Sequence, residues 1–245
     1  MKALNSLALF SIGATFAFAT WSSVAVAGSL RVAPTSLTFT APTSAGTLTL
    51  RNDGATPISV QMRPFAWSQF EGADELQGTR DVVVSPPIAT LEPGVDYVVR
   101  VVRVVKRPIV GEESYRILID QLPAAGIEQS NVSLLIRYSV PAFFTAPSAA
   151  RANVTWSLKS DRNGVRLSAV NQGDRNFRVA NLKARLPQGM TRSLRDGLVG
   201  YVLGRSEVVW RLPGSLPGPL EGELSLLGDS SEGSFDDTVV VGDVR

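Results

Sequence analysis

The side chains that could carry chemistry in this sequence are mainly carboxylates and arginines. The chain contains no histidine and no cysteine, so it lacks the commonest general base, the thiol nucleophile and the soft metal ligands. A Ser–His–Asp centre, a cysteine-dependent centre and a zinc site with His or Cys ligands are therefore excluded. Disulfides are excluded too, so each domain must be stabilised by its buried core.

The acidic pairs do not form a recognisable catalytic site. Glu112-Glu113 and Asp236-Asp237 are adjacent in sequence, so on a strand the two members of each pair point to opposite faces. We expect them to be solvated rather than to form a glycosidase-like dyad. The glycine-rich run at 197–204 does not have the spacing of either glycine-rich nucleotide-binding motif. The sequence thus predicts no enzyme, no cofactor and no metal site.

Three arginines interrupt otherwise apolar runs. They are Arg63 in "QMRPFAW", Arg116 in "SYRILID" and Arg137 in "LIRYSVP". A single arginine in a strand is usually solvated, but three in one domain suggest that some line a cleft, where arginine can bind a carboxylate through two parallel hydrogen bonds. The basic residues are scattered along the chain rather than clustered, so nucleic acid is not an expected partner.

Short β-type runs separated by turn residues would position these side chains. The first group covers 46–52, 58–67, 95–106, 114–122 and 131–144, and the second covers 154–160, 165–170, 177–186, 200–212 and 238–244. Small residues and one proline lie between the groups and indicate a hinge. Regularly spaced short strands are typical of sandwiches and barrels, so we predict two all-β domains at 28–147 and 148–245.

The run "NVSLLIRYSVPAFF" at 131–144 has an apolar residue at every second position. Val132, Leu134, Ile136, Tyr138 and Val140 would share one face, whereas Leu135 and Phe143 would face the core of their own domain. Pro141 cannot donate to a sheet ladder, which favours an edge strand, and it is expected to mark where pairing ends. A long apolar edge can template association with another chain.

The first 27 residues have the pattern of a secretory signal peptide. Lys2 precedes an apolar run that ends in Ala25-Val26-Ala27. A membrane anchor is the alternative, but polar residues interrupt the run and the Ala-x-Ala motif follows it directly. We therefore expect cleavage near Ala27 and export of the remaining chain.

Four segments together resemble the periplasmic pilus or fimbrial assembly chaperones, the PapD-like group. These segments are "SPPIATLEPG", "SYRILIDQLP", "IRYSVPAFF" and "YVLGRSEVVWRL". The resemblance implies two immunoglobulin-like sandwiches in a boomerang arrangement and a periplasmic chaperone that binds, folds and caps pilus subunits. The implied partners are pilus subunits and an outer-membrane usher. Self-association through the exposed strand is a further expectation.

In this family the last strand of the first domain is lent to a subunit that lacks its own final strand. The resemblance thereby makes Val132, Leu134, Ile136 and Tyr138 the donor-strand residues. Basic residues in the cleft anchor the terminal carboxylate of the subunit. The best-known branch carries one of them where this chain has Ser36 and another near Pro141.

Because those two positions are not basic here, Arg116 is the first candidate anchor, followed by Arg137 and then Arg63. "SYRI" and "RYSVP" are instead similar to the archaic or spore-coat-U-associated branch. Two alternatives stay open at this point. One is a structural or adhesive surface protein without chaperone activity, and the other is an exported hydrolase with two converging carboxylates.

Overall fold

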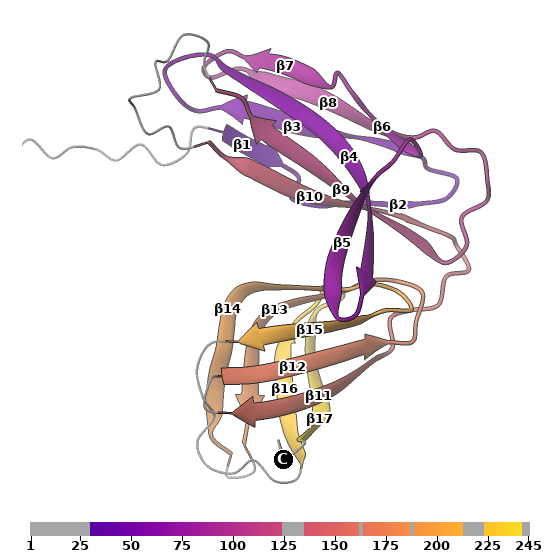
Figure 1. Cartoon of the computed structure of the whole chain (residues 1–245), viewed down its shortest axis with the longest axis vertical. Coiled ribbons are helices and arrows are strands. Elements are labelled where there is room, and N and C mark those ends of the chain that lie inside the picture. Colours follow the sequence, from indigo (N-terminus) through magenta and orange to yellow (C-terminus); the bar gives the residue numbers. More distant parts are fainter. Residues whose placement is uncertain (1–29, 124–134, 162–163, 187–188, 213–222, 242–245) are drawn as a thin grey trace, which may run out of the picture.

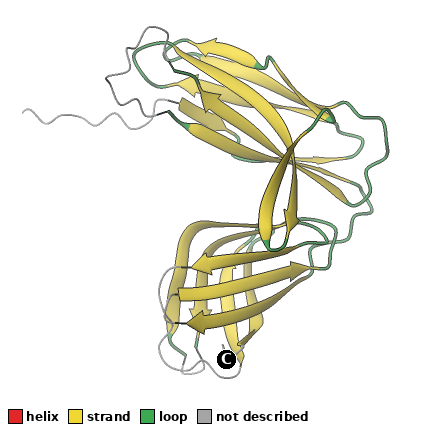
Figure 2. Ribbon diagram, in the orientation of Figure 1, coloured by secondary structure: helices red, strands yellow, loops and turns green. Residues whose placement is uncertain are grey.

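The computed structural model describes residues 30–123, 135–161, 164–186, 189–212 and 223–241. The predicted signal peptide, together with Val132 and Leu134, lies outside these residues. Within them every regular element is a strand, and the strands form two all-β domains that meet at an angle, as in a boomerang (Figures 1 and 2). No helix in the described part is long and apolar enough to cross a membrane.

The first domain contains two sheets that enclose one core. The first sheet has the order β1-β3-β8-β6, and the second has the order β2-β10-β9-β4-β5, with β7 also paired to β4. All pairs are antiparallel except β10 with β2. The strands are β1 (Leu30–Ala33), β2 (Leu37–Thr40), β3 (Ala45–Asn52), β4 (Ile58–Phe70), β5 (Ala73–Gly78), β6 (Val82–Ser85), β7 (Ile88–Leu91), β8 (Asp96–Arg103), β9 (Glu112–Gln121) and β10 (Arg137–Thr145).

The core of this domain follows from period-2 alternation in the strands. Leu48 and Leu50 of β3 face Ile117 and Ile119 of β9 across the sandwich, and all four side chains are fully buried. Each such aliphatic side chain stabilises the fold by about 1.5–3 kcal/mol relative to an exposed one. The opposite face of β9 consequently points away from this core, and that face carries Arg116.

The second domain is built from seven strands in the order β14-β13-β16-β17-β11-β12-β15. Trp156 stacks on Phe235 at a centroid distance of 5.8 Å beside a core of aliphatic side chains. The strands are β11 (Val154–Asp161), β12 (Gly164–Asn171), β13 (Phe177–Arg185), β14 (Thr191–Val202), β15 (Glu207–Leu212), β16 (Glu223–Asp229) and β17 (Ser234–Val241).

One predicted run of the second domain is divided in the structure. The sequence at 200–212 reads as one strand, but β14 ends at Val202 and β15 begins at Glu207. Arg205, with φ of 57°, makes the turn between them. The turn separates β14 and β15 to opposite ends of the sheet order, so a run that reads as one strand contributes to two edges.

A hairpin formed by β4 and β5 extends from the first domain onto the second (Figure 1). At its tip, Val209 of β15 donates a backbone hydrogen bond of 2.9 Å to the carbonyl oxygen of Gly72. Gly72 has φ of 79°, and a Cβ atom there would lie 2.8 Å from Cγ2 of Val209. Glycine is therefore required at this contact, both for its backbone conformation and for the close approach of the two domains.

A small aromatic cluster completes the junction, and we call it the joint cluster. It consists of Trp67, Phe143, Tyr201 and Leu203, all buried, the first two from the first domain and the last two from the second. Tyr201 packs edge-on against Trp67 at a centroid distance of 5.6 Å. The side chain of Gln69 ties the same region together, because it donates to the carbonyl of Tyr201 at 2.8 Å and accepts from the amide of Leu203 at 2.9 Å.

Candidate functional site

The three arginines singled out from the sequence lie on one face of the second sheet of the first domain. In the strand register Arg63 is opposite Leu118, Arg116 is opposite Phe65, and Arg137 is opposite Asp120. Residues directly opposite each other share a face of the sheet. This face is the one turned away from the sandwich core, so the structure brings all three arginines to a common surface.

Arg63 and Arg137 converge on a single carboxylate. The guanidinium of Arg63 lies 2.7 Å from Oδ2 of Asp120, and Nε of Arg137 donates to Oδ1 of the same residue. Burial by itself would raise the pKa of Asp120, but the hydrogen bonds from Arg137 and Arg63 outweigh it and lower that pKa. A carboxylate from a partner would have to compete with Asp120 for either arginine.

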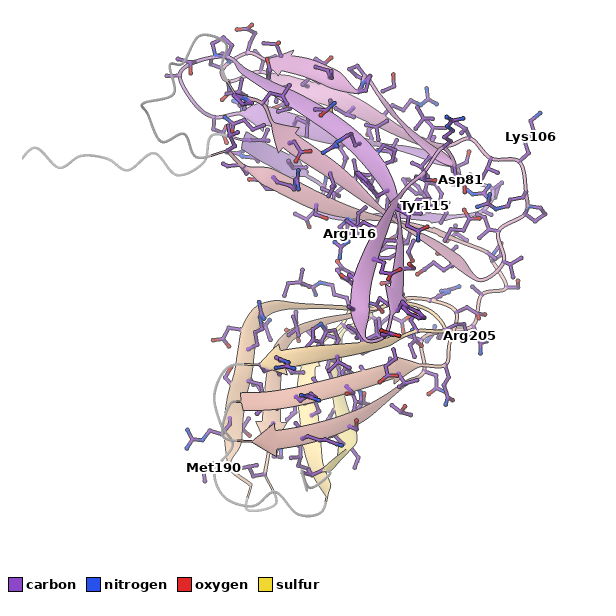
Figure 3. All side chains as sticks on the ribbon, in the orientation of Figure 1. Asp81, Lys106, Tyr115, Arg116, Met190 and Arg205 are labelled. Atoms are coloured by element: carbon purple, nitrogen blue, oxygen red, sulfur yellow. The ribbon has the colours of Figure 1, made fainter. Side chains whose placement is uncertain are left out.

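Arg116 packs against aromatic rings, whereas Arg63 and Arg137 pair with a carboxylate. Its guanidinium carbon lies 3.6 Å from the ring centroid of Trp67 and 5.5 Å from that of Tyr201. One guanidinium nitrogen donates a long hydrogen bond of 3.4 Å to the carbonyl of Ser139. Figure 3 places Arg116 at the angle between the domains, beside the β4–β5 hairpin.

The charge of Arg116 is only weakly compensated. No carboxylate in the described part of the chain forms an ion pair with it, and burial lowers its pKa from the ordinary value. Aromatic faces attract a cation but do not supply hydrogen-bond acceptors for its N–H groups. The guanidinium can therefore gain charge-assisted hydrogen bonds from a carboxylate that enters the angle between the domains.

Strand β10 offers a free edge over its first half. It pairs with β9 along its whole length, from Arg137 to Thr145, whereas β2 pairs only with Ala142–Thr145. The other edge of Arg137–Pro141 is therefore unpaired among the described strands, as the presence of proline predicts. Pro141 is the last residue of this free edge, because the ladder with β2 begins at Ala142, whereas the ladder with β9 runs through the proline to Thr145. That Pro141 marks the end of pairing with a partner strand stays a prediction.

The residues predicted for the donor strand have different environments. Ile136 is half-buried next to the start of β10, and its carbonyl accepts from the amide of Gln121 at 3.0 Å. Tyr138 packs against the core of the first domain, and its hydroxyl donates to the carbonyl of Leu30 at 2.6 Å. Tyr138 thus links β10 to β1 of its own domain, whereas Val132 and Leu134 lie outside the described residues.

The two residues expected on the opposite face of this run do not enter the sandwich core. Leu135 is 45% exposed, because it precedes β10 and no second layer covers it. Phe143 is buried, but in the joint cluster, since its side of the sheet faces the second domain. The period-2 pattern separates the two faces, but the prediction of which face enters the sandwich core was wrong. Val140 lies in that core and Tyr138 packs against it, whereas the face of Phe143 meets the second domain.

The glutamate pair also departs from its expected role. Glu112 and Glu113 do point to different surroundings, but neither is simply solvated. Glu113 pairs with Arg103 at 2.7 Å and accepts from the hydroxyl of Tyr115 at 2.9 Å. Glu112 is bonded to Asn176 of the second domain, so it forms part of the junction. The expectation of solvation was wrong because the sequence does not show which strand ends meet at the domain boundary.

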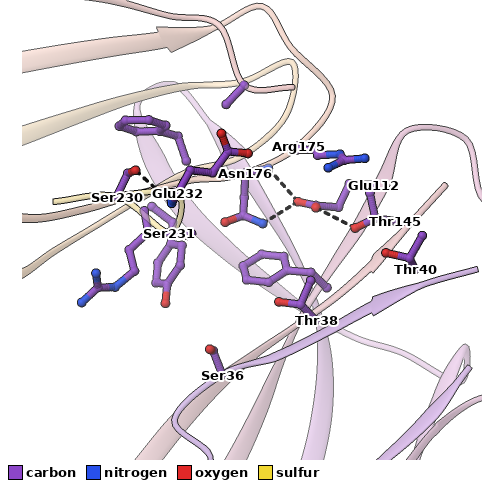
Figure 4. Close-up of a pocket in the computed structure, with 15 residues that line it drawn as sticks. Ser36, Thr38, Thr40, Glu112, Thr145, Arg175, Asn176, Ser230, Ser231 and Glu232 are labelled. Atoms are coloured by element: carbon purple, nitrogen blue, oxygen red, sulfur yellow. Dashed lines mark hydrogen bonds between the residues drawn. The ribbon is translucent and has the colours of Figure 1, made fainter. Parts of the chain in front are cut away.

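A polar cavity of about 250 Å³ lies between the domains, next to the joint cluster. Phe143 and Tyr201 of that cluster form part of the cavity wall. Glu112, Thr38 and Ser36 approach it from the first domain, and Arg175 approaches it from the second (Figure 4). The sequence gives no indication of this cavity, because its walls combine residues 36–40 with residues 175–178, which are more than a hundred positions apart in the chain. No cluster of acidic side chains suited to a metal ion occurs in the described ranges.

Comparison with known proteins places the chain in a family. Residues 29–150 match the model for the pili and flagellar-assembly chaperone, PapD N-terminal domain. The chain belongs to this family of pilus assembly chaperones. No match is found among curated proteins.

Solved structures of such chaperones share the fold of the whole two-domain unit. The chaperone–tip adhesin subunit complex CsuC–CsuE, from the archaic Csu pili of Acinetobacter baumannii, matches with a TM-score of 0.64 and 24% identity over 88% of this chain and 99% of that chain. The Escherichia coli chaperone DraB matches with a TM-score of 0.59 and 21% identity over 86% of this chain and 96% of that chain. The complex of the SafA pilin with the SafB chaperone of Salmonella enterica gives a TM-score of 0.59 and 19% identity over the same shares.

Proposed function

We propose that this pilus assembly chaperone holds its subunit by lending it the strand that leads into β10. The observation that carries the proposal is the unpaired edge of Arg137–Pro141, which continues toward the apolar run containing Val132, Leu134 and Ile136. A subunit strand added at this edge would complete a backbone hydrogen-bond ladder. The apolar side chains would fill the groove left by the missing subunit strand.

The expected energetics favour this arrangement. Three or four buried aliphatic side chains contribute on the order of 5–10 kcal/mol before the costs of association are subtracted. Backbone hydrogen bonds are largely independent of sequence, so the fit of side chains in the groove would determine which subunits are accepted. Tyr138 would act mainly as the point where the lent strand joins its own domain, since its hydroxyl is bonded to Leu30.

We propose Arg116 as the anchor for the terminal carboxylate of the subunit. Its guanidinium is partly buried at the angle between the domains and has no carboxylate partner within the described ranges. Arg137 and Arg63 rank behind it because Asp120 already occupies them. An arginine–carboxylate contact at a fixed point would set the register of the added strand, which the backbone ladder alone leaves open.

The cellular setting follows from the family and from the leader pattern. Chaperones of this family are periplasmic, and we propose that residues 1–27 direct the chain there and are removed. Delivery of the subunit to an outer-membrane usher, and self-association of the free chaperone through the same edge, are parts of the proposal. The similarity of "SYRI" and "RYSVP" to the archaic or spore-coat-U-associated branch suggests simple pili as the product.

A direct experiment is co-purification from periplasmic extract, with the captured proteins identified by mass spectrometry. If the chain acts as proposed, one or a few subunits that lack a complete immunoglobulin-like fold should co-purify with it. They should be released when the chaperone is denatured. The alternative, a structural or adhesive β-protein without chaperone activity, expects a chain that needs no such partner. Recovery of the folded protein without any subunit, from cells that express the pilus genes, would support that alternative.

A further inference from the structure

Three basic side chains form a row on the outer face of the second domain, and we call this set the cationic row. Lys159 of β11 is directly opposite Arg166 of β12, and Arg166 is directly opposite Arg211 of β15. All three side chains are exposed. They are not adjacent in the sequence, and only the pairing of the neighbouring strands β11, β12 and β15 brings them side by side (Figure 1).

The alternation of side chains along the strands directs the cationic row away from the core. The adjacent level of the sheet contains Leu158, Leu167 and Trp210, which are also directly opposite one another and which pack in the core of the second domain. Successive side chains of a strand point to opposite faces, so the row lies on the solvent side. It is also separate from the cavity between the domains, because none of its members lines that cavity.

The cationic row places like charges where a sheet usually avoids them. Directly opposite residues have Cβ atoms about 4.5–5.5 Å apart, and like charges at such positions are destabilising. No carboxylate among the described side chains forms an ion pair with any member of the row. Glu207 is an exposed acid on the same face, but it lies four residues before Arg211 along β15, which corresponds to about 13 Å. The three charges are therefore available together to an anionic partner.

The surroundings of the row favour a phosphate surface over a protein partner. The next level on the same face contains Ser157, Ser168 and Val209, and Val209 already contacts Gly72 of the β4–β5 hairpin. Protein interfaces gain most of their binding energy from large side chains that fill fitted pockets, and this level supplies no such anchor. Hydroxyl, ammonium and guanidinium groups all donate hydrogen bonds to phosphate oxygens. A row of cations bordered by hydroxyls on a sheet face is suited to the headgroups of anionic lipids.

We propose that the cationic row docks the second domain against the anionic surface of a membrane. Each basic side chain near such a surface strengthens binding by about fivefold, so three of them give an attraction that is weak and reversible. The formal net charge of the whole chain is only +2, so the attraction comes from the arrangement of the charges rather than from their sum. A chaperone held in this way searches for its delivery site along a surface rather than through a volume. The docking does not depend on how the subunit is held.

The first test is co-sedimentation of the purified chain, from residue 28 onward, with lipid vesicles. Vesicles of phosphatidylglycerol and phosphatidylcholine in equal parts are compared with vesicles of phosphatidylcholine alone. We expect binding to the anionic vesicles only. This binding should fall when the salt concentration is raised from about 0.01 M to about 0.15 M, because the Debye length decreases from about 30 Å to about 8 Å. Equal binding to both kinds of vesicle, or no binding to the anionic vesicles at low salt, would overturn the proposal.

The second test replaces all three members of the cationic row with glutamine. We expect this triple variant to bind the anionic vesicles at least about tenfold more weakly than the unchanged chain. The matched control is Lys183→Gln/Arg192→Gln/Arg195→Gln, which removes the same charge from exposed positions of β13 and β14. The control should bind almost as well as the unchanged chain. Equal losses in the two triple variants would show that net charge, and not the row, is responsible for binding.

A single substitution separates lost docking from lost folding. Arg166→Glu places an acid between Lys159 and Arg211, so both cross-strand pairs become attractive. We expect this variant to be at least as stable to heat as the unchanged chain, but to bind anionic vesicles at least about tenfold more weakly. Full vesicle binding by Arg166→Glu would overturn the proposal.

An acidic polypeptide is the other partner that such a row could bind, and soluble polyglutamate is the probe for it. We expect polyglutamate to compete only weakly with anionic vesicles for the unchanged chain. If polyglutamate instead binds more tightly than the vesicles do, and the triple variant does not bind it, the row is a site for an acidic protein and the membrane proposal fails.

Discussion

The guanidinium of Arg116 lies over the ring of Trp67, 3.6 Å from its centroid, at the point where the two domains meet. Trp67 in turn packs against Phe143 and against Tyr201 of the second domain. This relationship keeps a cation partly buried at the junction, and no carboxylate among the described residues forms an ion pair with it. A ligand that binds Arg116 therefore contacts a residue whose position depends on both domains.

Replacing Arg116 with alanine is expected to reduce subunit capture at least about tenfold, since a hydrogen bond to a charged group contributes about 1.5–3 kcal/mol. The measurement is the yield of subunit that co-purifies with tagged chaperone after co-expression. Arg63→Ala is the matched control, because Arg63 lies on the same face of the sheet but is already paired with Asp120. Normal capture by Arg116→Ala together with reduced capture by Arg63→Ala would mean that Arg63, and not Arg116, anchors the subunit carboxylate.

Replacing Ile136 with aspartate is expected to abolish capture while the chaperone stays folded. Ile136 is half-buried and precedes the first residue of β10, so a charge there disturbs the lent edge more than the sandwich core. The same pull-down provides the readout. Leu135→Asp is the control, because the side chain of Leu135 is 45% exposed and lies on the other side of the run. Soluble subunit recovered with Ile136→Asp would show that the donor strand has been assigned to the wrong residues.

The sequence predicts more of the fold than of the site. Alternating apolar residues such as Leu48 and Leu50 report directly on burial within one sandwich, because strand periodicity and the core of the same domain impose the same pattern. Residues at the junction between the domains show no such pattern in the sequence. Phe143, Gln69 and Glu112 look like ordinary strand residues until the second domain is placed against them. The arginine face was foreseeable from three arginines in apolar strands, whereas the role of Asp120 depends on strand register.

Because Asp120 pairs with both Arg63 and Arg137, the stability of the fold should depend on pH, and the direction of that dependence can be worked out. Its pKa is lowered in the folded protein, so ionised Asp120 stabilises the fold at pH values above its ordinary pKa of about 3.9. That contribution is lost as the pH falls through the folded-state pKa. Asp120→Asn should therefore be less stable than wild type at pH 7, by roughly 0.5–1 kcal/mol because the arginines are partly exposed.

Urea unfolding of wild type and Asp120→Asn at pH 7 and at pH 3 measures this difference. The gap between the two proteins should narrow at pH 3, because below the ordinary pKa of about 3.9 the unfolded wild-type chain takes up a proton at Asp120 that folding must release. Other carboxylates with lowered pKa values, such as Glu113, titrate equally in both proteins and so cancel in the comparison. A gap of the same size at both pH values would mean that the ion pairs with Arg63 and Arg137 do not stabilise the fold.

The hydrogen bonds of Gln69 across the junction should restrict the angle between the domains. Its side chain bonds the carbonyl of Tyr201 at 2.8 Å and the amide of Leu203 at 2.9 Å. Truncation in Gln69→Ala leaves both backbone groups without these partners, at a cost of about 1–3 kcal/mol each if water cannot replace them. The joint cluster alone would then hold the angle, and we expect a wider range of domain orientations.

The absence of cysteine from the sequence allows this to be measured with two spin labels. Cysteines placed at Thr47 in the first domain and at Lys159 in the second, both exposed, report the distance between the domains by double electron–electron resonance. Gln69→Ala should broaden the distance distribution relative to wild type. Gln77→Ala, an exposed substitution in the same hairpin, should leave it unchanged. Equal widths in all three proteins would mean that the joint cluster and the contact between Gly72 and Val209 fix the angle without Gln69.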